Sequence, residues 1–226
     1  MTLYSLLNNA VTQYSQNRAL KTESGQWLTF KEIGDIAVKL SSFLKKNGVP
    51  DGGTVLLDMP KDSRYAAAIL ACLLKGYCIV PVNFDYPEGR KQTIRTDSRA
   101  DFTLTKELYD AALNEASDDF SGGSTDSSLD SSFEPKENAI AVYIFTSGST
   151  GKPKGVMLDQ QCIAEQVIRN NLVLKLTDED VWGQVASFTF IAGIEEILAA
   201  FTSGAGALLI DGMTVRNPEA LAEFYF

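Results

Sequence analysis

The residues best suited to chemistry lie in one short stretch, residues 146–155, with the sequence TSGSTGKPKG. The apolar run that precedes it, residues 139–145, predicts a buried strand that leads directly into the stretch. Small residues let the backbone approach a ligand closely, and glycine accepts the positive φ that turns amides inward. Inward amides form a nest for an anion, to which the hydroxyl groups add donors and Lys152 and Lys154 add positive charge. This composition predicts a phosphate-binding loop.

Two other interpretations of the stretch agree less well with its residues. A Walker phosphate loop requires G-x-x-x-x-G-K-[ST], but here Gly151-Lys152 is followed by Pro153, and Gly148 is only three residues upstream of Gly151. A flexible Gly/Ser surface connection is the second alternative. It does not explain why a strand leads straight into the stretch, nor why lysines stand on both sides of Pro153.

The stretch TSGSTGKPKG after an apolar strand resembles the phosphate-loop signature of the adenylate-forming superfamily. That superfamily comprises acyl-CoA synthetases, adenylation domains of nonribosomal peptide synthetases, and luciferases. In these proteins the loop closes over the β- and γ-phosphates of ATP while a carboxylate attacks the α-phosphate, which gives an acyl-adenylate and pyrophosphate. The resemblance therefore implies ATP and Mg²⁺ as cofactors of the complete enzyme. It assigns the ATP contacts to Thr146, Ser147, Gly148, Ser149, Thr150, Gly151, Lys152 and Lys154.

Three further blocks resemble the same superfamily, in the family order. Residues 28–33 resemble L-T-Y-x-E-L, a block that serves packing, and residues 69–83 resemble ILAVLKAGGAYVPLD. Residues 187–197 are similar to S-F-x-F-D-A-S-V-W-E-I of peptide-synthetase adenylation domains. After the phosphate loop many family members carry V-x-x-x-H, where this chain has Asp159 and Gln160.

The most informative departure from the family pattern is at Ile191. In the register set by SFTF and EI, the family aspartate that pairs with the α-ammonium of an amino acid substrate falls on this residue. An apolar wall cannot compensate a buried ammonium, whose desolvation costs several kcal/mol when it is unpaired. The sequence therefore disfavours an α-amino acid and favours an aryl, fatty, α-keto or hydroxy acid. The resemblance places Phe190, Ile191, Ala192 and Glu195 in the acid pocket.

Glu195 offers a second way to hold an amine. It lies one helical turn after Ile191, at i+4, so the two side chains share a helix face. Its carboxylate is placed to receive an amine farther along the substrate, as in a β-amino acid. The alternative, a solvated glutamate on a helix surface, remains open.

The elements that must position these residues predict an α/β fold, with a mostly parallel sheet flanked by helices. Strand, helix and strand at 55–59, 62–75 and 79–82 form a βαβ unit. We expect further strands at 19–23, 27–29, 102–104, 156–158, 181–186 and 205–210. We expect further helices at 2–16, 29–46, 87–98, 160–172, 194–201 and from Pro218 onward. Thr29 and Glu32 predict a capping box, and residues 156–158 a hairpin with the strand before the loop.

Residues 1–226 are interpreted as a partial domain, the first part of the large amino-terminal domain of an adenylate-forming enzyme. The family's adenine-binding and ribose-binding blocks, its hinge and its catalytic lysine lie farther toward the carboxyl end. We therefore assign no catalytic residue and no metal ligand to this chain, and expect it to be inactive alone. Residues 114–138, rich in Ser, Asp and Gly, predict a surface loop.

Composition excludes several functional classes. The formal net charge of −9 argues against nucleic acid or an anionic membrane as a partner. No apolar run approaches the roughly 20 residues of a membrane-spanning helix, and residues 1–4 do not resemble a signal peptide, so we expect the cytosol. The chain has 0 His, which excludes His-based triads and His metal sites. Its 3 Cys lack metal-site spacing and indicate buried thiols.

The expected partners follow from the resemblance. They are a carboxylic acid substrate and a thiol acceptor, which is either a carrier protein with a phosphopantetheine arm or CoA. The remainder of the domain is a further candidate partner. Two other classes remain open. One is a non-catalytic docking fragment completed by another chain, and the other is a nucleotide-binding protein unrelated to adenylation. An acyl-CoA ligase is the alternative within the family.

Overall fold

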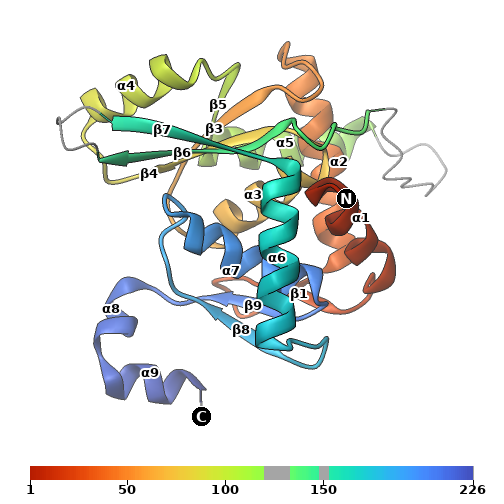
Figure 1. Ribbon diagram of the computed structural model, residues 1–226, viewed down its shortest axis with the longest axis vertical. Helices are drawn as coiled ribbons and strands as arrows, with labels where there is room; N and C mark the ends of the chain where they lie inside the picture. The colour runs from red at the N-terminus through yellow and green to blue at the C-terminus, as the bar shows by residue number, and fades with distance from the viewer. Residues whose placement is uncertain (120–132, 148–152, 226) are drawn as a thin grey trace.

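The structure is a computed structural model that describes residues 1–119, 133–147 and 153–225. Two β-sheets lie in different parts of the molecule, with helices around and between them (Figure 1). The α/β class with mostly parallel strands flanked by helices is confirmed. The strands divide between two sheets, however, where we expected one.

The larger sheet has the strand order β5-β3-β4-β6-β7. Its strands are β3 (Thr54–Met59), β4 (Cys78–Asn83), β5 (Phe102–Thr105), β6 (Ile140–Ser147) and β7 (Pro153–Asp159). β3 pairs in parallel with β4 and β5, β4 pairs in parallel with β6, and β7 runs antiparallel to β6. The predicted βαβ unit and the predicted hairpin, whose strands β6 and β7 lie on either side of the phosphate-loop sequence, are thereby confirmed.

The two faces of this sheet pack against different helices. Leu56, Val80 and Phe145 belong to a small cluster with Ile94 of α4 (Glu88–Ser98). Their neighbours along the strands, such as Val55, Ile79 and Ile144, belong to the large core on the opposite face. Because successive side chains of a strand point to opposite faces, nearly continuous apolar runs are what a sheet covered on both faces requires.

The second sheet has the order β2-β1-β9-β8. Its strands are β1 (Arg18–Lys21), β2 (Trp27–Thr29), β8 (Val181–Gln184) and β9 (Gly206–Leu209). β1 and β2 form the predicted antiparallel hairpin, and β9 lies parallel to both β1 and β8. Segments from the two ends of the chain thus share one sheet.

The helices follow the predicted pattern with shifted ends. They are α1 (Leu3–Gln13), α2 (Phe30–Lys46), α3 (Ser63–Leu74), α4, α5 (Lys106–Asp119), α6 (Gln160–Leu174), α7 (Ile191–Thr202), α8 (Gly212–Arg216) and α9 (Pro218–Tyr225). Thr29 and Glu32 form the predicted capping box of α2. The short helix α8 was not predicted. None of the described helices has the length and apolar character needed to cross a membrane.

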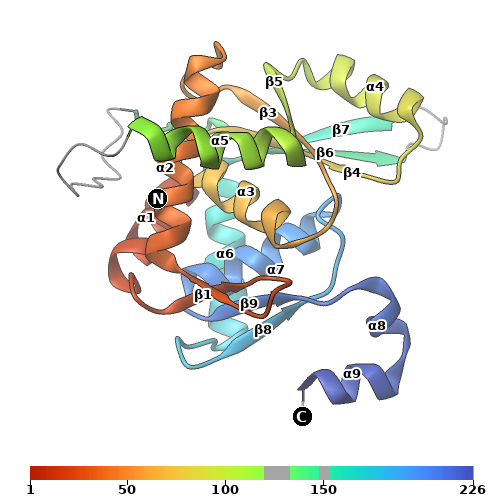
Figure 2. The same ribbon diagram turned by 180° about the vertical axis from the view of Figure 1, so that it is seen from behind.

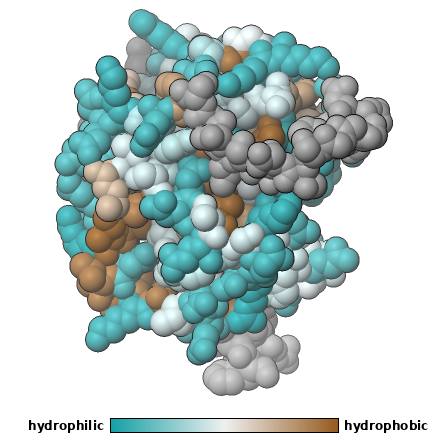
Figure 3. Space-filling model, turned by 90° about the vertical axis from the view of Figure 1, so that its right-hand side faces the viewer, coloured by the Kyte–Doolittle hydropathy of each residue, from teal (hydrophilic) through white to brown (hydrophobic). Residues whose placement is uncertain are grey.

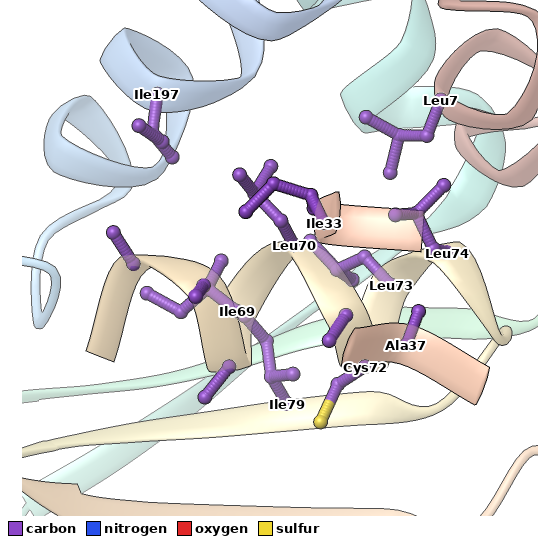
Figure 4. Close-up of a cluster of buried hydrophobic side chains, with 14 of the residues drawn as sticks. Leu7, Ile33, Ala37, Ile69, Leu70, Cys72, Leu73, Leu74, Ile79 and Ile197 are labelled. Atoms are coloured by element: carbon purple, nitrogen blue, oxygen red, sulfur yellow. The ribbon is translucent and has the colours of Figure 1, made fainter. Parts of the chain in front are cut away.

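Helix α3 lies at the centre of the molecule. Apart from Arg64, all of its residues are buried, and it contacts β3 and β4 of one sheet and β1 of the other. Ile69, Leu70 and Leu73 meet side chains of α1, α2, β4 and α7 (Figure 4). Figure 2 shows α3 from behind, between the strands of the two sheets.

The predicted loop at 114–138 needs correction at both ends. Residues 114–119 belong to helix α5, which ends at Asp119. Within this part of the helix, Glu115 forms an ion pair with Lys46 of α2. At the other end Pro135 is buried, and Phe133 packs so closely on Gly52 that an added Cβ would lie 2.9 Å from its ring. Both apolar side chains are covered by the body of the protein. Residues 120–132 of this prediction lie outside the described residues.

The prediction of buried thiols is correct for Cys72 and Cys78 and wrong for Cys162, which is exposed. Cys162 lies in the first turn of α6, whose buried face is formed by Ile163, Ala164 and Val167. These positions follow the helical period, and residue 162 falls outside that stripe. Burial raises the pKa of Cys72 to about 12 and that of Cys78 to about 11, so neither is a reactive thiolate at neutral pH.

Glu23 links the β1–β2 hairpin to α3 and predicts a pH-dependent stability. Its carboxylate accepts hydrogen bonds of 2.6 Å from both the backbone nitrogen and the hydroxyl of Ser63. Burial raises the pKa of Glu23, but the bonds from Ser63 outweigh it, so the folded pKa lies below the ordinary value of 4.5. Such a carboxylate stabilises the fold above its unfolded pKa and loses that contribution as pH falls through the folded pKa.

We therefore expect Glu23→Gln to lower the free energy of unfolding by a constant amount above pH 4.5, and by progressively less as pH falls below it. Urea unfolding of both proteins across this range measures the difference. The exposed Glu165→Gln is the control. A difference that does not change with pH would mean that the Glu23 charge is not responsible.

Candidate functional site

The β6–β7 hairpin carries the ends of the predicted phosphate loop. Thr146 pairs with Lys154 and Ser147 with Pro153, so the two strands remain in register up to the loop. The Thr146 hydroxyl donates a 3.3 Å hydrogen bond to the Lys154 carbonyl oxygen. The remaining predicted loop residues, Gly148, Ser149, Thr150, Gly151 and Lys152, lie outside the described residues. Thr146 and Lys154 are both exposed.

Strand alternation determines which way this end of the hairpin faces. Ile144 packs in the large core, whereas Tyr143 and Phe145 pack in the small cluster under α4. Thr146, two residues after Ile144, therefore lies on the face of the large core, and directly paired residues share a face. Thr146 and Lys154 thus belong to the face that carries the large core, in which Ile194 and Ile197 of α7 are also buried.

The final glycine of the stretch has a packing role. Gly155 is paired with Phe145, and the ring of the neighbouring Tyr143 lies directly over it. A Cβ on Gly155 would fall well inside van der Waals contact with the Tyr143 ring and 2.7 Å from its hydroxyl oxygen. This glycine is required by cross-strand packing and needs no ligand to explain it.

The predicted acid-pocket residues lie together at the start of α7. Phe190 is the N-cap residue and is 61% exposed, Ile191 opens the helix and packs against the large core, and Ala192 is exposed. The helix begins at residue 191, before the predicted 194. Glu195 follows one turn later, is half-buried, and accepts a 3.4 Å hydrogen bond from the Asn170 side chain of α6. Glu195 therefore contacts the protein and is not a freely solvated glutamate.

The two predicted groups lie on one side of the molecule. The end of the β6–β7 hairpin and the start of α7 both point left in Figure 1 and right in Figure 2. Each follows the carboxyl end of a strand, β6 in one case and β8 in the other. Ligands of open α/β sheets bind at this edge of the strands. The fold thus brings the hairpin of the predicted phosphate loop and the predicted acid-pocket segment to the same edge, from two different sheets.

Asp159 and Gln160, which depart from the family pattern, have structural roles. The Asp159 side chain caps α6 by accepting a 2.7 Å hydrogen bond from the Cys162 nitrogen. Gln160 is fully buried, and the oxygen of its side-chain amide accepts a 2.9 Å hydrogen bond from the backbone nitrogen of Tyr4 in α1. Asp159 thus fixes the start of α6, and Gln160 attaches it to the amino-terminal helix.

Three polar residues near the acid-pocket segment were not singled out from the sequence: Lys61, Gln184 and Glu196. Glu196 is adjacent to Glu195, Gln184 ends an apolar strand, and Lys61 follows Pro60. A polar residue at the end of an apolar strand was the signal available for Gln184. The hydrogen bonds that define their roles join distant segments, so spacing along the chain could not reveal them.

The described residues suit a polyphosphate but offer no prepared metal site. The exposed Thr146 hydroxyl and Lys154 ammonium match the donors that phosphate oxygens need. Within residues 1–119, 133–147 and 153–225, no group of three or more His, Cys, Asp and Glu side chains could hold a metal ion.

Comparison with known proteins gives a consistent result. The family model described as AMP-binding enzyme matches residues 7–225. Gramicidin S synthase 1 from Brevibacillus brevis is 29% identical over 223 residues, covering 96% of this chain and 20% of that protein. Tyrocidine synthase 2 from Brevibacillus parabrevis is 28% identical over 229 residues, covering 99% of this chain and 6% of that protein. The chain thus spans one fifth or less of the length of these relatives.

Two solved structures share the fold. A complex of VinN with 3-methylaspartate superposes with a TM-score of 0.80 at 20% identity, covering 97% of this chain and 64% of that one. The N-terminal subdomain of Klebsiella oxytoca NpsA, in complex with 3-hydroxybenzoyl-AMSN, gives a TM-score of 0.78 at 19% identity, covering 95% and 56%. At this identity the likeness shows a common fold.

The contact between Gly155 and Tyr143 predicts a specific double-mutant result. Gly155→Ala should destabilise the protein by about 1–3 kcal/mol, because overpacking forces the neighbouring ring to move. In a Tyr143→Leu background the same alanine should be nearly neutral, since the ring is absent. Urea unfolding of the four proteins gives the coupling energy. Equal costs of the alanine in both backgrounds would show that the ring is not the cause.

Proposed function

Because the chain belongs to the AMP-binding enzyme family, we propose that it forms the amino-terminal part of an adenylation domain that activates a carboxylic acid with ATP. One observation carries this proposal. The β6–β7 hairpin, which bears the phosphate-loop sequence, and the start of α7, which bears the acid-pocket sequence, lie at the same edge of the molecule. A carboxylate and a triphosphate must meet at one place for this reaction.

The chemistry proposed for the complete domain is a displacement at phosphorus. A carboxylate oxygen attacks the α-phosphate of ATP, the bond to the bridging oxygen breaks, and pyrophosphate leaves with that electron pair. Residues 146–154 would hold the β- and γ-phosphates, with Lys152 and Lys154 as cations. Mg²⁺ would further neutralise the phosphate charge. Positioning and charge neutralisation supply most of the catalysis in such reactions.

A thiol, which loses its proton, then attacks the acyl carbon of the acyl-adenylate, and AMP leaves as the thioester forms. We propose a carrier protein with a phosphopantetheine arm as the acceptor, in nonribosomal peptide or related biosynthesis, and CoA remains the alternative. Support comes from the peptide synthetases among the relatives and from a solved neighbour described as an artificially fused Adenylation-PCP di-domain. The interpretation of residues 1–226 as a partial domain that is inactive alone is part of this proposal.

The proposed acid is not a standard α-amino acid. Ile191 packs with its apolar side chain against the large core, so it offers no charge to an α-ammonium. Among the solved neighbours, VinN is described in complex with 3-methylaspartate and with L-aspartate, and NpsA with aryl derivatives. In an aspartate the amine lies one carbon farther from one of the two carboxyl groups. We propose that Glu195, which is half-buried one turn after Ile191, holds such a distant amine.

A second candidate function, a non-catalytic docking fragment, is favoured by one surface feature. Exposed apolar side chains gather near the end of α6, where Leu172 is 73% and Val173 is 76% exposed, next to Leu174. Figure 3 shows hydrophobic surface at the edge that corresponds to the front of Figure 1, where α6 lies. Apolar patches of this kind serve protein contacts. Acid-dependent exchange of pyrophosphate into ATP by the complete protein separates this candidate from the enzyme.

The loop lysines give the first test of the enzyme. In the complete protein, replacing both Lys152 and Lys154 with Ala should slow acid-dependent ATP–pyrophosphate exchange tens-fold or more, because each charged hydrogen bond to a polyphosphate contributes about 1–3 kcal/mol. Circular dichroism should show an unchanged fold. The control is Lys136→Ala, which removes an exposed lysine shortly before the first residue of β6, at the end of the strand away from the loop. An unchanged rate in the double variant would mean that the stretch only connects two strands.

A panel of α-amino, β-amino, keto, aryl and fatty acids in the same assay tests the acid pocket. A non-α-amino acid should be activated at least ~100-fold better by kcat/KM than the α-amino acid of matching skeleton, a difference of about 3 kcal/mol. Ile191→Asp should narrow or invert that preference. If Glu195 holds a β-ammonium, Glu195→Gln should lower kcat/KM for the amine-bearing acid and leave kcat/KM for the other acids unchanged. An α-amino acid that wins the panel with Ile191 in place would overturn the assignment.

A further inference from the structure

The segment that leads into the acid pocket has its backbone held by a carboxylate. One oxygen of Glu196, on α7, accepts hydrogen bonds from the Val185 nitrogen at 2.9 Å and the Ala186 nitrogen at 3.0 Å. The same oxygen accepts a 3.1 Å bond from the side-chain amide of Gln184. Gln184 is fully buried, and its amide also donates to the Ala186 carbonyl oxygen at 2.6 Å. One charged group therefore organises three consecutive residues at the end of β8 and just after it.

A cation holds the other side of the same residues. The Lys61 ammonium donates to the Val185 carbonyl oxygen at 2.7 Å and reaches the Ile210 carbonyl oxygen at 3.5 Å. It also lies 5.8 Å from the centre of the buried Phe188 ring. Removal of the ammonium from water lowers the pKa of Lys61, while the carboxylates of Glu196 and Asp211 act in the opposite direction. Both backbone groups of Val185 are thus bound by charged side chains.

These contacts connect the two sheets. Lys61 lies between β3 and α3, and β3 belongs to the sheet that carries the phosphate-loop hairpin. Val185 and Ile210 follow β8 and β9 of the other sheet. The hydrogen bonds from Lys61 to Val185 and Ile210 therefore hold the carboxyl end of β3 in one sheet against the carboxyl ends of β8 and β9 in the other.

A displacement of residues 184–186 would also displace the predicted acid-pocket residues at the start of α7, because the two segments are in contact. Gly193, in the first turn of α7, lies so close to this segment that an added Cβ would be 2.9 Å from the Ala186 carbonyl oxygen and closer still to Ser187. The Phe190 nitrogen donates a 3.0 Å bond back to the Ser187 carbonyl oxygen. The segment and Gly193 are therefore in contact, and Ile191 lies between them in the chain.

We propose that Lys61 and Glu196 are positioning residues that place residues 190–192 relative to the phosphate-loop hairpin, and thereby determine how tightly the acid is held. The proposal rests on the function proposed above. Neither residue needs to touch the substrate. Their effect is on the geometry of two groups carried by different sheets, and reactions that depend on alignment are sensitive to small displacements.

The first experiment uses the chain itself and needs no activity. Amide hydrogen exchange followed by NMR compares the unmodified protein with Glu196→Ala, Glu196→Gln, Lys61→Met and Lys61→Arg. We expect Glu196→Ala to speed exchange at Val185 and Ala186 at least about tenfold, because hydrogen bonds to a charged group are lost, while α3 amides stay protected. The matched controls are Glu165→Gln and Lys31→Met. Unchanged exchange at Val185 and Ala186 would overturn the proposal.

The second experiment uses the complete adenylating protein. Lys61→Met and Glu196→Gln should each raise KM for the acid about tenfold or more and leave KM for ATP within about twofold, because the phosphate-loop hairpin keeps its place. Lys61→Arg should restore the acid KM, since a guanidinium can donate to both carbonyl oxygens. A merely structural role would lower activity toward acid and ATP alike.

The outcomes separate the two proposals. Faster exchange at Val185 and Ala186 with an unchanged acid KM would overturn the positioning role and leave the proposed function intact. If the unmodified complete protein activates no acid, the proposed function fails and the positioning role fails with it. The exchange measurements would still decide whether Glu196 and Lys61 hold the segment.

Discussion

The burial of α3 is the constraint on which the rest of the structure depends. Its apolar side chains contact strands of both sheets and helices α1 and α2, so the two halves of the molecule share one core (Figure 4). Each fully buried leucine or isoleucine contributes on the order of 1.5–3 kcal/mol. The small residues Ala66, Ala67 and Ala68 are also buried and leave room for close packing on both sides. This helix is therefore the main apolar contact between the two sheets, beside the polar link that Lys61 makes.

The candidate site is a consequence of that arrangement. Each sheet ends in irregular chain at the carboxyl side of its strands, and the common core brings these ends to one edge. The larger sheet contributes an antiparallel hairpin, which is stiff up to Ser147 and Pro153 because its strands stay in register. The smaller sheet contributes the start of α7, whose approach is held by Glu196 and Lys61. In the proposed function, phosphate binding and acid recognition therefore belong to different sheets.

Departures from the family pattern have different meanings at different positions. Asp159 and Gln160 replace part of a family motif, yet one caps α6 and the other is buried against α1, so both serve packing. Gly155 belongs to the phosphate-loop signature, but the ring of Tyr143 explains its presence. Ile191 has no such explanation beyond its contact with the core, and the register of residues 187–197 predicts that it replaces a charged residue of the family pattern. Ile191 is therefore the residue at which the proposed substrate differs from an α-amino acid.

Local patterns in the sequence determined much of the fold. The apolar runs of β3, β4 and β6, the helical period of α1 and α6, and the capping box at Thr29 are encoded within a few residues and were predicted from them. The loop sequence TSGSTGKPKG likewise determined the chemistry proposed for the site. Such features need only neighbouring residues to be recognised.

Only the tertiary structure decided how these parts combine. The division into two sheets depends on the pairing of β1 with β9, whose residues are far apart in the chain. The continuation of α5 to Asp119, the burial of Pro135 and the exposure of Cys162 each depend on which surfaces are covered by distant elements. The bonds from Lys61 and Glu196 to Val185 join three separate segments. Pairing, burial and long-range hydrogen bonds are set by the packed core, and sequence spacing carries no record of them.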